Sequence, residues 1–223
     1  MPAWMPQPVW SGEEAFILGG GNSLQTFDWN LLRREHVVGC NQAFRLGPEI
    51  CDYVIFCDHK FIKESGRTPR TGVYDQLAVF PNPVVTNDPA LRNASEPWLK
   101  WMPRRPTGLH RDALGYNFNT GAAAINLALL LGATTIYLLG FDMQLGPGRR
   151  PNWHNHLIDK PSPGVYDRMI RSFVWVNQDL HNKFPDCRIF NVTRGSRLEV
   201  FPKLDFETFW RERAGVAAPV AAV

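Results

Sequence analysis

The sequence predicts an α/β fold: a Rossmann-like three-layer sandwich with a mainly parallel sheet. Short apolar runs without strict alternation recur along the 223 residues, which is typical of parallel strands buried on both faces. Stretches with helical features separate these runs, and strand–helix alternation builds such a sandwich through right-handed crossovers. The length and the balance of 44% hydrophobic to 20% charged residues predict a single domain over 1–223.

Five runs are short, apolar and bounded by polar or chain-breaking residues, as buried strands are. The predicted strands are 15–19, 36–40, 53–57, 135–140 and 188–192, and further candidates are 77–81 and 98–102. Helices are predicted over 23–34, over 119–133 (capped by Asn119 or Thr120 and ended by Gly132), over 163–184 and over 205–215. The Pro- and Arg-rich stretch 65–117 predicts an irregular insertion or a lid, and 216–223 a flexible tail.

Charge and hydropathy narrow the classes of partner. The net charge of +3 permits an anionic ligand but does not by itself indicate nucleic acid. The sequence contains no run of eighteen apolar residues, so we expect no membrane span and a cytoplasmic location.

The first predicted strand ends in three glycines, Gly19, Gly20 and Gly21, followed by Asn22 and Ser23. At the carboxyl end of a parallel strand, glycine lets an anionic group approach the backbone, and a following helix offers free N–H groups. The alternative is a tight strand-to-helix turn without a ligand. The spacing is not GxGxxG, which disfavours an ordinary dinucleotide cofactor.

Polar residues also follow the next strands. The second strand ends in Asn41 and Gln42, whose amides both donate and accept and could recognise a base or a sugar, or could cap a turn. The third ends at Asp58 and the fourth at Asp142. Because carboxyl ends of parallel strands meet at one edge, these residues predict a single ligand site there.

Two further features belong to the same predicted edge. Thr120 and Gly121 begin the helix over 119–133, where a phosphate could bind, although a helix cap with a packing glycine explains them equally. His154 and His156 lie in a loop after the fourth strand and suit a general base, with surface imidazoles as the alternative. Two histidines at this spacing without a third ligand are a weak zinc signal, so we predict no metal site.

Together these motifs resemble a known family. The segments "ILGGGNSL", "GCNQAF", "NTGAAAINLALLLGATTIYLLGFDM" and "NVTRGSRLEVFP", with the histidine loop, resemble the MptE-like family, which includes archaeal 6-hydroxymethylpterin diphosphokinases. The same pattern is similar to bacterial sialyltransferases of glycosyltransferase family 42. The match covers most of 15–60 and 117–202 and leaves the Pro/Arg-rich middle uncovered.

The sialyltransferase resemblance implies a CMP-activated sugar on the glycine turn and the Asn-Gln pair, a histidine base and no metal. Carried over by position, the implied donor site is Gly19, Gly20, Gly21, Asn22, Ser23, Asn41, Thr120 and Gly121, with His154 or His156 as the base. Asn22 stands where that motif has Pro. The tyrosine expected after the Gly-Ile-Asp segment is missing from "GFDMQLG", which leaves Tyr166, Arg149 or Arg150 to assist the leaving group.

The sequence therefore favours a nucleotide-dependent glycosyltransferase with a nucleotide-sugar donor and a glycan or small-molecule hydroxyl acceptor. The predicted catalytic residues are His154, His156 and Asp142, and Gln42 and Asp58 join the nucleotide-binding set. A diphosphokinase using ATP and magnesium, with Asp142 facing the metal, is one alternative. A phage-type transferase that modifies DNA bases, suggested by the arginines of "RTPR" and "PRRP", and a non-catalytic nucleotide-binding protein are the others.

Overall fold

A seven-stranded sheet forms the centre of the molecule in the computed structural model, which describes residues 3–58, 60–63, 72–154 and 164–215. Every strand pair in it is parallel, and the spatial order is β5-β4-β3-β2-β1-β8-β9. The strands are β1 (Glu14–Leu18), β2 (His36–Cys40), β3 (Tyr53–Phe56), β4 (Val84–Thr86), β5 (Leu99–Trp101), β8 (Thr135–Leu139) and β9 (Arg188–Asn191). This confirms the predicted Rossmann-like α/β class.

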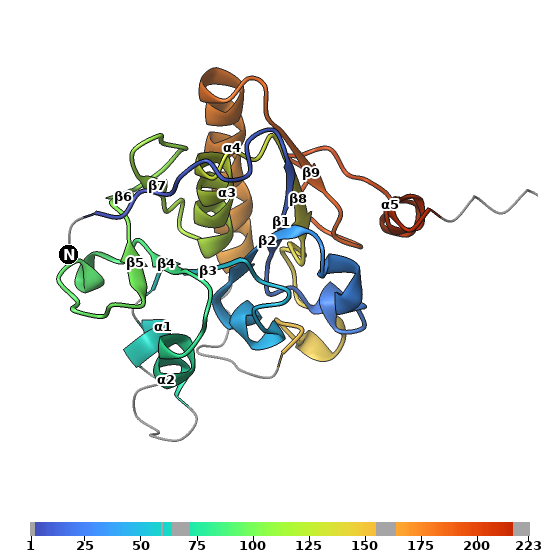
Figure 1. Cartoon of the computed structure of the whole chain (residues 1–223). Coiled ribbons are helices and arrows are strands. Elements are labelled where there is room, and N and C mark those ends of the chain that lie inside the picture. The colour runs from blue at the N-terminus through green and yellow to red at the C-terminus, as the bar shows by residue number, and fades with distance from the viewer. Residues whose placement is uncertain (1–2, 59, 64–71, 155–163, 216–223) are drawn as a thin grey trace, which may run out of the picture.

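Two hydrophobic cores cover the two faces of the sheet. Ile17 of β1 belongs to the core formed with α3 (Thr120–Leu130) and α4 (Val165–Lys183), whereas its neighbours Phe16 and Leu18 belong to the other. The second core is covered by α5 (Phe206–Arg213), α2 (Val73–Ala78) and the 3-10 turns η1 (Asn22–Leu24), η2 (Trp29–Leu32) and η3 (Asn41–Leu46). Figure 1 shows α3 and α4 side by side, with α5 across the sheet from them. The strands are apolar without alternation because both faces are buried.

Most predicted elements are confirmed within a residue or two. Helix α3 has Asn119 as its N-cap, whose side chain accepts from the Ala122 N–H at 2.7 Å, and Gly132 follows its end at φ +98°. Asp205 caps α5 in the same way, accepting from the Thr208 N–H at 2.9 Å.

Two predicted elements are wrong. The helix over 23–34 is replaced by η1 and η2, because the Asp28 side chain accepts from the Asn30 N–H at 3.0 Å and restarts the chain in a new turn. The candidate strand over 77–81 falls on the last two residues of α2 and the chain that follows it, where Val79 is 80% exposed.

The stretch 65–117 differs from a wholly irregular insertion. It supplies β4 and β5 to the main sheet, the turn η5 (Pro89–Leu91), and a small pair of strands, β6 (Arg104–Arg105) with β7 (Leu114–Gly115). The short helix α1 (Lys60–Lys63) precedes it and η6 (Pro147–Arg149) follows β8. The predicted tail 216–223 lies outside the described residues. Among the residues that the structure describes, no helix is long and apolar enough to span a bilayer.

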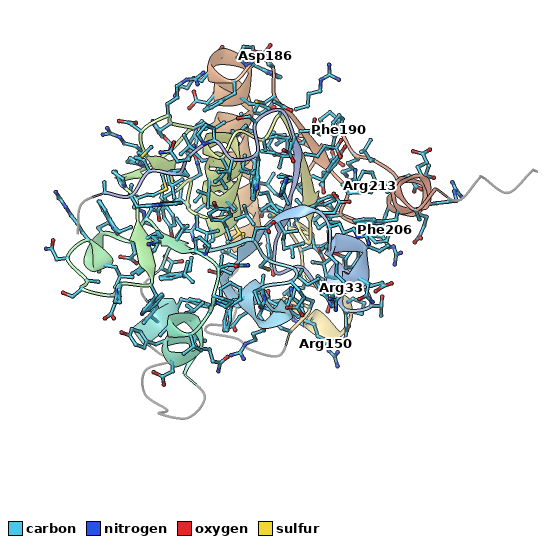
Figure 2. The ribbon with its side chains drawn as sticks, in the orientation of Figure 1. Arg33, Arg150, Asp186, Phe190, Phe206 and Arg213 are labelled. Carbon is cyan, nitrogen blue, oxygen red and sulfur yellow. The ribbon has the colours of Figure 1, made fainter. Side chains whose placement is uncertain are left out.

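Helix α5 docks through one cation as well as through its aromatic residues. The Arg213 guanidinium lies over the rings of Phe16, Tyr137 and Phe209, and it pairs with Glu14 and Glu35 at 2.6 Å each. Figure 2 labels Arg213 beside α5. This network attaches α5 to the start of β1. The site described next lies at the other end of the strands, where their carboxyl ends meet.

Candidate functional site

A cavity of about 330 Å³ opens at the carboxyl ends of β1, β2 and β8. It lies where the strand order reverses, since the chain runs outward from β1 to β5 and then returns with β8 beside β1. Ligand sites in open parallel sheets occur at such switch points. The predicted site residues that line this cavity are Gly19, Gly20, Gly21, Asn41, Gln42, Thr120, Gly121, Asp142 and His154.

The glycine turn after β1 is crossed closely by the end of β8. A Cβ on Gly19 would lie 2.5 Å from the Gly140 carbonyl oxygen, and a Cβ on Gly21 would overlap the Asp142 carboxylate. The Gly21 N–H donates to the Gly140 carbonyl at 2.9 Å. Close packing within the protein therefore explains why positions 19 and 21 are glycine. A Cβ on Gly20 would instead lie 3.0 Å from the Asn152 side-chain oxygen, and both residues line the cavity.

Asp142 binds the turn that follows the glycines. Its Oδ1 accepts from Ser23 Oγ at 2.6 Å and its Oδ2 from the Ser23 N–H at 2.8 Å. The N–H that was expected to be free for an anion is therefore bonded to a carboxylate of the chain itself. Burial raises the pKa of Asp142, while the hydrogen bonds from Ser23 oppose the shift. These two bonds connect the segment after β8 to η1.

Asn22 and Ser23 do not line the cavity. Ser23 holds Asp142, and the Asn22 side chain packs against Gly146 with its Oδ1 buried and unbonded within the described chain. Asp58 is exposed and lies outside the cavity, where its Oδ1 accepts from Tyr116 Oη at 3.1 Å. The structure thus separates these three predicted residues from the other binding-site candidates.

The end of β2 presents an amide pair on the cavity wall. Asn41 adopts a left-handed conformation with φ +51°, which asparagine tolerates better than most residues. Gln42 is buried, and its Oε1 accepts from Arg45 Nε at 2.6 Å, which orients the amide. Arg45 is in turn held by Gln76 at 2.9 Å. The Gln42 amide is therefore positioned by contacts outside the cavity, whereas Asn41 is placed by its backbone conformation.

The N-terminus of α3 faces the same space. Thr120 and Gly121 line the cavity, and the first N–H groups of a helix have no partner within the helix. The cap is itself anchored, because Asn119 Nδ2 donates to Ser172 Oγ on α4 at 3.0 Å. A Cβ on Gly121 would lie 2.6 Å from the Phe141 ring, so this glycine also permits close packing. The arrangement suits an anionic group.

His154 lies at the cavity on a loop tied to the glycine turn. The Trp153 N–H donates to the Gly20 carbonyl at 3.0 Å, and the Trp153 ring stands edge-on to the His154 imidazole at 5.0 Å and packs on Trp29 at 5.1 Å. His154 is half-buried. His156 lies outside the described residues.

Tyr166 is the side chain of most chemical interest that strand-end motifs do not reveal. It lies in the first turn of α4, lines the cavity with Val165 and Met169, and is partly buried. Burial raises its pKa, and the nearby Asp142 charge adds to the shift. Among the described residues, no group of three or more His, Cys, Asp or Glu side chains is placed to hold a metal ion.

Comparison with known proteins bears on the fold. The structure is similar to that of the MAf glycosyltransferase from Magnetospirillum magneticum AMB-1, with a TM-score of 0.56 and 16% sequence identity over 92% of this chain. The alignment covers 35% of that protein, so this chain spans about a third of its length. No protein-family model matches the chain, and no curated protein matches it. The likeness shows a fold shared with a glycosyltransferase; the resemblance to the MptE-like and sialyltransferase families stays a prediction.

Proposed function

We propose that this protein is a glycosyltransferase that moves a sugar from a nucleotide-activated donor to a hydroxyl acceptor. The observation that carries the proposal is the cavity at the switch point, where a glycine turn, a helix N-terminus and the His154 imidazole face one another. The shared fold with the MAf glycosyltransferase supports it. The chain over 1–223 then acts as one nucleotide-binding transferase domain.

The donor phosphate belongs at the start of α3 in this proposal. Thr120 and Gly121 offer backbone N–H groups there, and the helix dipole favours a negative charge. The Ser23 N–H is taken by Asp142, which moves the expected phosphate from η1 toward α3. Asn41 then lies on the wall where its amide can bond the base or the sugar of the donor, such as a CMP-sugar.

The chemistry needs a base and a means of releasing the phosphate. His154 takes the proton of the acceptor hydroxyl as its oxygen attacks the anomeric carbon, and the bond from that carbon to the phosphate oxygen breaks with its electron pair on the phosphate. Tyr166 donates a hydrogen bond to the departing phosphate. A phenol is protonated at neutral pH, as that role requires, and burial raises the pKa of Tyr166 further. These steps use side chains of this chain and require no metal ion.

The diphosphokinase alternative gains no specific support from the geometry. It would set Asp142 toward a metal, whereas both oxygens of that carboxylate accept hydrogen bonds from Ser23. The DNA-modifying and non-catalytic alternatives likewise have no observation that favours them over the transferase.

Nucleotide binding tests the proposal directly. Titration calorimetry with CMP, UDP, GDP and ATP, each with and without magnesium, should show metal-independent binding of a nucleotide that also raises the melting temperature. A nucleotide-sugar of the same base should then be hydrolysed slowly in the absence of an acceptor. Binding of ATP alone, and only with magnesium, would replace the proposal with the diphosphokinase.

A further inference from the structure

Two aromatic side chains stand in solvent beside the cavity. Phe118 is 44% exposed and Trp175 is 42% exposed, and their ring centroids lie 6.4 Å apart at an angle of 52°. We name this pair the aromatic ledge. Phe118 immediately precedes Asn119, and Trp175 lies on the same helix as Met169; both Asn119 and Met169 line the cavity. Two neighbouring exposed rings offer an apolar face on which a ligand can pack.

The backbone is held in an unusual conformation at the ledge. Asn117 and Phe118 have φ values of +49° and +59°, a left-handed region that is costly for a bulky side chain. The buried Asn117 side chain maintains it: Oδ1 accepts from the Gly108 N–H at 2.7 Å, and Nδ2 donates to the Gly108 carbonyl at 2.9 Å. A buried network therefore keeps the following aromatic ring in place at the rim.

A carboxylate is anchored through Tyr116, whose ring neighbours that of Phe118. The Tyr116 ring lies 6.0 Å from the Phe118 ring, and Tyr116 Oη donates to the exposed Asp58 at 3.1 Å. The Arg104 guanidinium lies 3.5 Å from the Tyr116 centroid and donates to the Cys57 carbonyl at 3.3 Å. Tyr116 is thus clamped and is not a stacking surface on its Arg104 side, which leaves Phe118 and Trp175 as the open rings and Asp58 as the polar end.

We propose that the aromatic ledge and Asp58 form the acceptor subsite, and that the acceptor is a carbohydrate. The inference rests on the proposed function, because it assigns the second substrate of that reaction. A pyranose ring has an apolar C–H face that packs on aromatic rings and hydroxyl groups that donate to a carboxylate. In this proposal the acceptor, bound on Phe118 and Trp175 with a hydroxyl on Asp58, lies next to the part of the donor cavity that Asn119 lines. The geometry therefore favours a glycan over an acceptor without a ring to stack.

Saturation-transfer NMR with defined probes tests the assignment. The probes are methyl β-galactopyranoside, methyl β-glucopyranoside and lactose, with a serine- and threonine-containing peptide as the other occupant. We expect a saccharide to receive saturation at its ring C–H protons. Its affinity should fall at least tenfold in Trp175→Ala and several-fold in Asp58→Asn. Val174→Ala removes a neighbouring side chain of equal exposure from the same helix and should leave binding unchanged.

Nucleotide titration on the same samples separates the two proposals. Intact nucleotide binding with saccharide binding that is lost in Trp175→Ala supports the subsite. Saccharide binding that is equal in wild type and Trp175→Ala, or contact by the peptide alone, overturns it while the transferase proposal stands. Absence of nucleotide binding in the wild type defeats the transferase proposal, and with it the acceptor role. Trp175 lies in the middle of α4, where alanine favours the helix, so this variant should fold.

Discussion

The side chain of His154 carries the proton in the proposed reaction. His154 is held at the cavity because the backbone of the preceding Trp153 is bonded to the glycine turn. Removing the His154 side chain should leave that backbone bond intact. We expect His154→Ala to lower kcat by about 10²–10⁴-fold, the usual contribution of general base catalysis, with the nucleotide Kd almost unchanged. Steady-state kinetics and calorimetry measure the two quantities. His181→Ala, an exposed histidine near the other end of α4, is the control and should behave as wild type. Full activity in His154→Ala would assign the base to another group.

Asn41 combines a side-chain role with a backbone one, and two substitutions separate them. Asn41→Gly keeps the left-handed backbone accessible and removes only the amide, so the nucleotide Kd should rise about tenfold, which corresponds to one hydrogen bond of about 1.4 kcal/mol. Asn41→Ala should weaken binding similarly and also destabilise the fold by about 1 kcal/mol, because alanine tolerates a positive φ less well than asparagine does. Calorimetry and urea unfolding distinguish the two effects. Wild-type affinity in Asn41→Gly would show that the amide does not touch the nucleotide.

At the scale of single elements, the cap of α3 links stability to binding. Asn119→Ala removes the acceptor of the Ala122 N–H and should cost about 1 kcal/mol of stability. It should also weaken nucleotide binding, since the cap positions Thr120 and Gly121 at the cavity. Asp205→Ala removes the corresponding cap from α5 and should lower the melting temperature with no change in nucleotide affinity. Equal nucleotide affinity in the two variants would separate α3 from the phosphate site.

Strands β4 and β5 make a second element-level prediction. β4 pairs in parallel with β3, and β5 pairs in parallel with β4, so both strands belong to the main sheet. Hydrogen exchange should show 84–86 and 99–101 protected in the free protein to a degree similar to β2. Rapid exchange there, comparable to that of exposed loops, would favour the irregular insertion that the composition of 65–117 suggests.

The predictability of each element follows from how local its signal is. The run 135–140 predicts β8 to within a residue because a strand buried on both faces is apolar throughout. β4 has three residues between prolines and Asn87, too few to show a pattern. The wrong helix over 23–34 depends on whether Asp28 bonds the backbone locally or continues the helix, a competition that apolar spacing does not register.

The same reasoning applies to the candidate site. Gly20, Asn41 and Thr120 were predictable because they follow strands or begin a helix, and parallel topology brings such positions to one edge. Tyr166 was named only as one of three candidates to assist the leaving group, with Arg149 and Arg150, because it follows no strand end. The docking of α4 brings Tyr166 to the cavity, which neither arginine lines. The bond between Ser23 and Asp142 was unpredictable for a related reason: sequence offered each as a ligand contact, and only tertiary structure shows that they satisfy each other.

The molecule as a whole should respond to pH through Asp142. Because burial raises its pKa above the ordinary 3.8, the folded state holds this proton more tightly than the unfolded state does. That contribution to stability is fully present below pH 3.8 and is lost as the pH rises through the folded-state pKa. Asp142→Asn lacks the titration and can still bond Ser23. Its free energy of unfolding relative to wild type should therefore increase from pH 3.8 toward neutrality in urea titrations. A difference that does not vary with pH would contradict the assignment.

The bond between Ser23 and Asp142 also has a consequence for how the protein acquires its activity. The two residues are 119 positions apart in sequence. The cavity therefore needs both the glycine turn near the start of this interval and the segment after β8 at its end. Contacts so distant in sequence form late, after the intervening chain has paid its loop-closure entropy. An N-terminal fragment ending before β8 would thus contain the glycines and the Asn-Gln pair without a ligand pocket. During refolding, nucleotide binding should therefore appear only when folding is complete. The bound nucleotide then reports the completed fold rather than local structure.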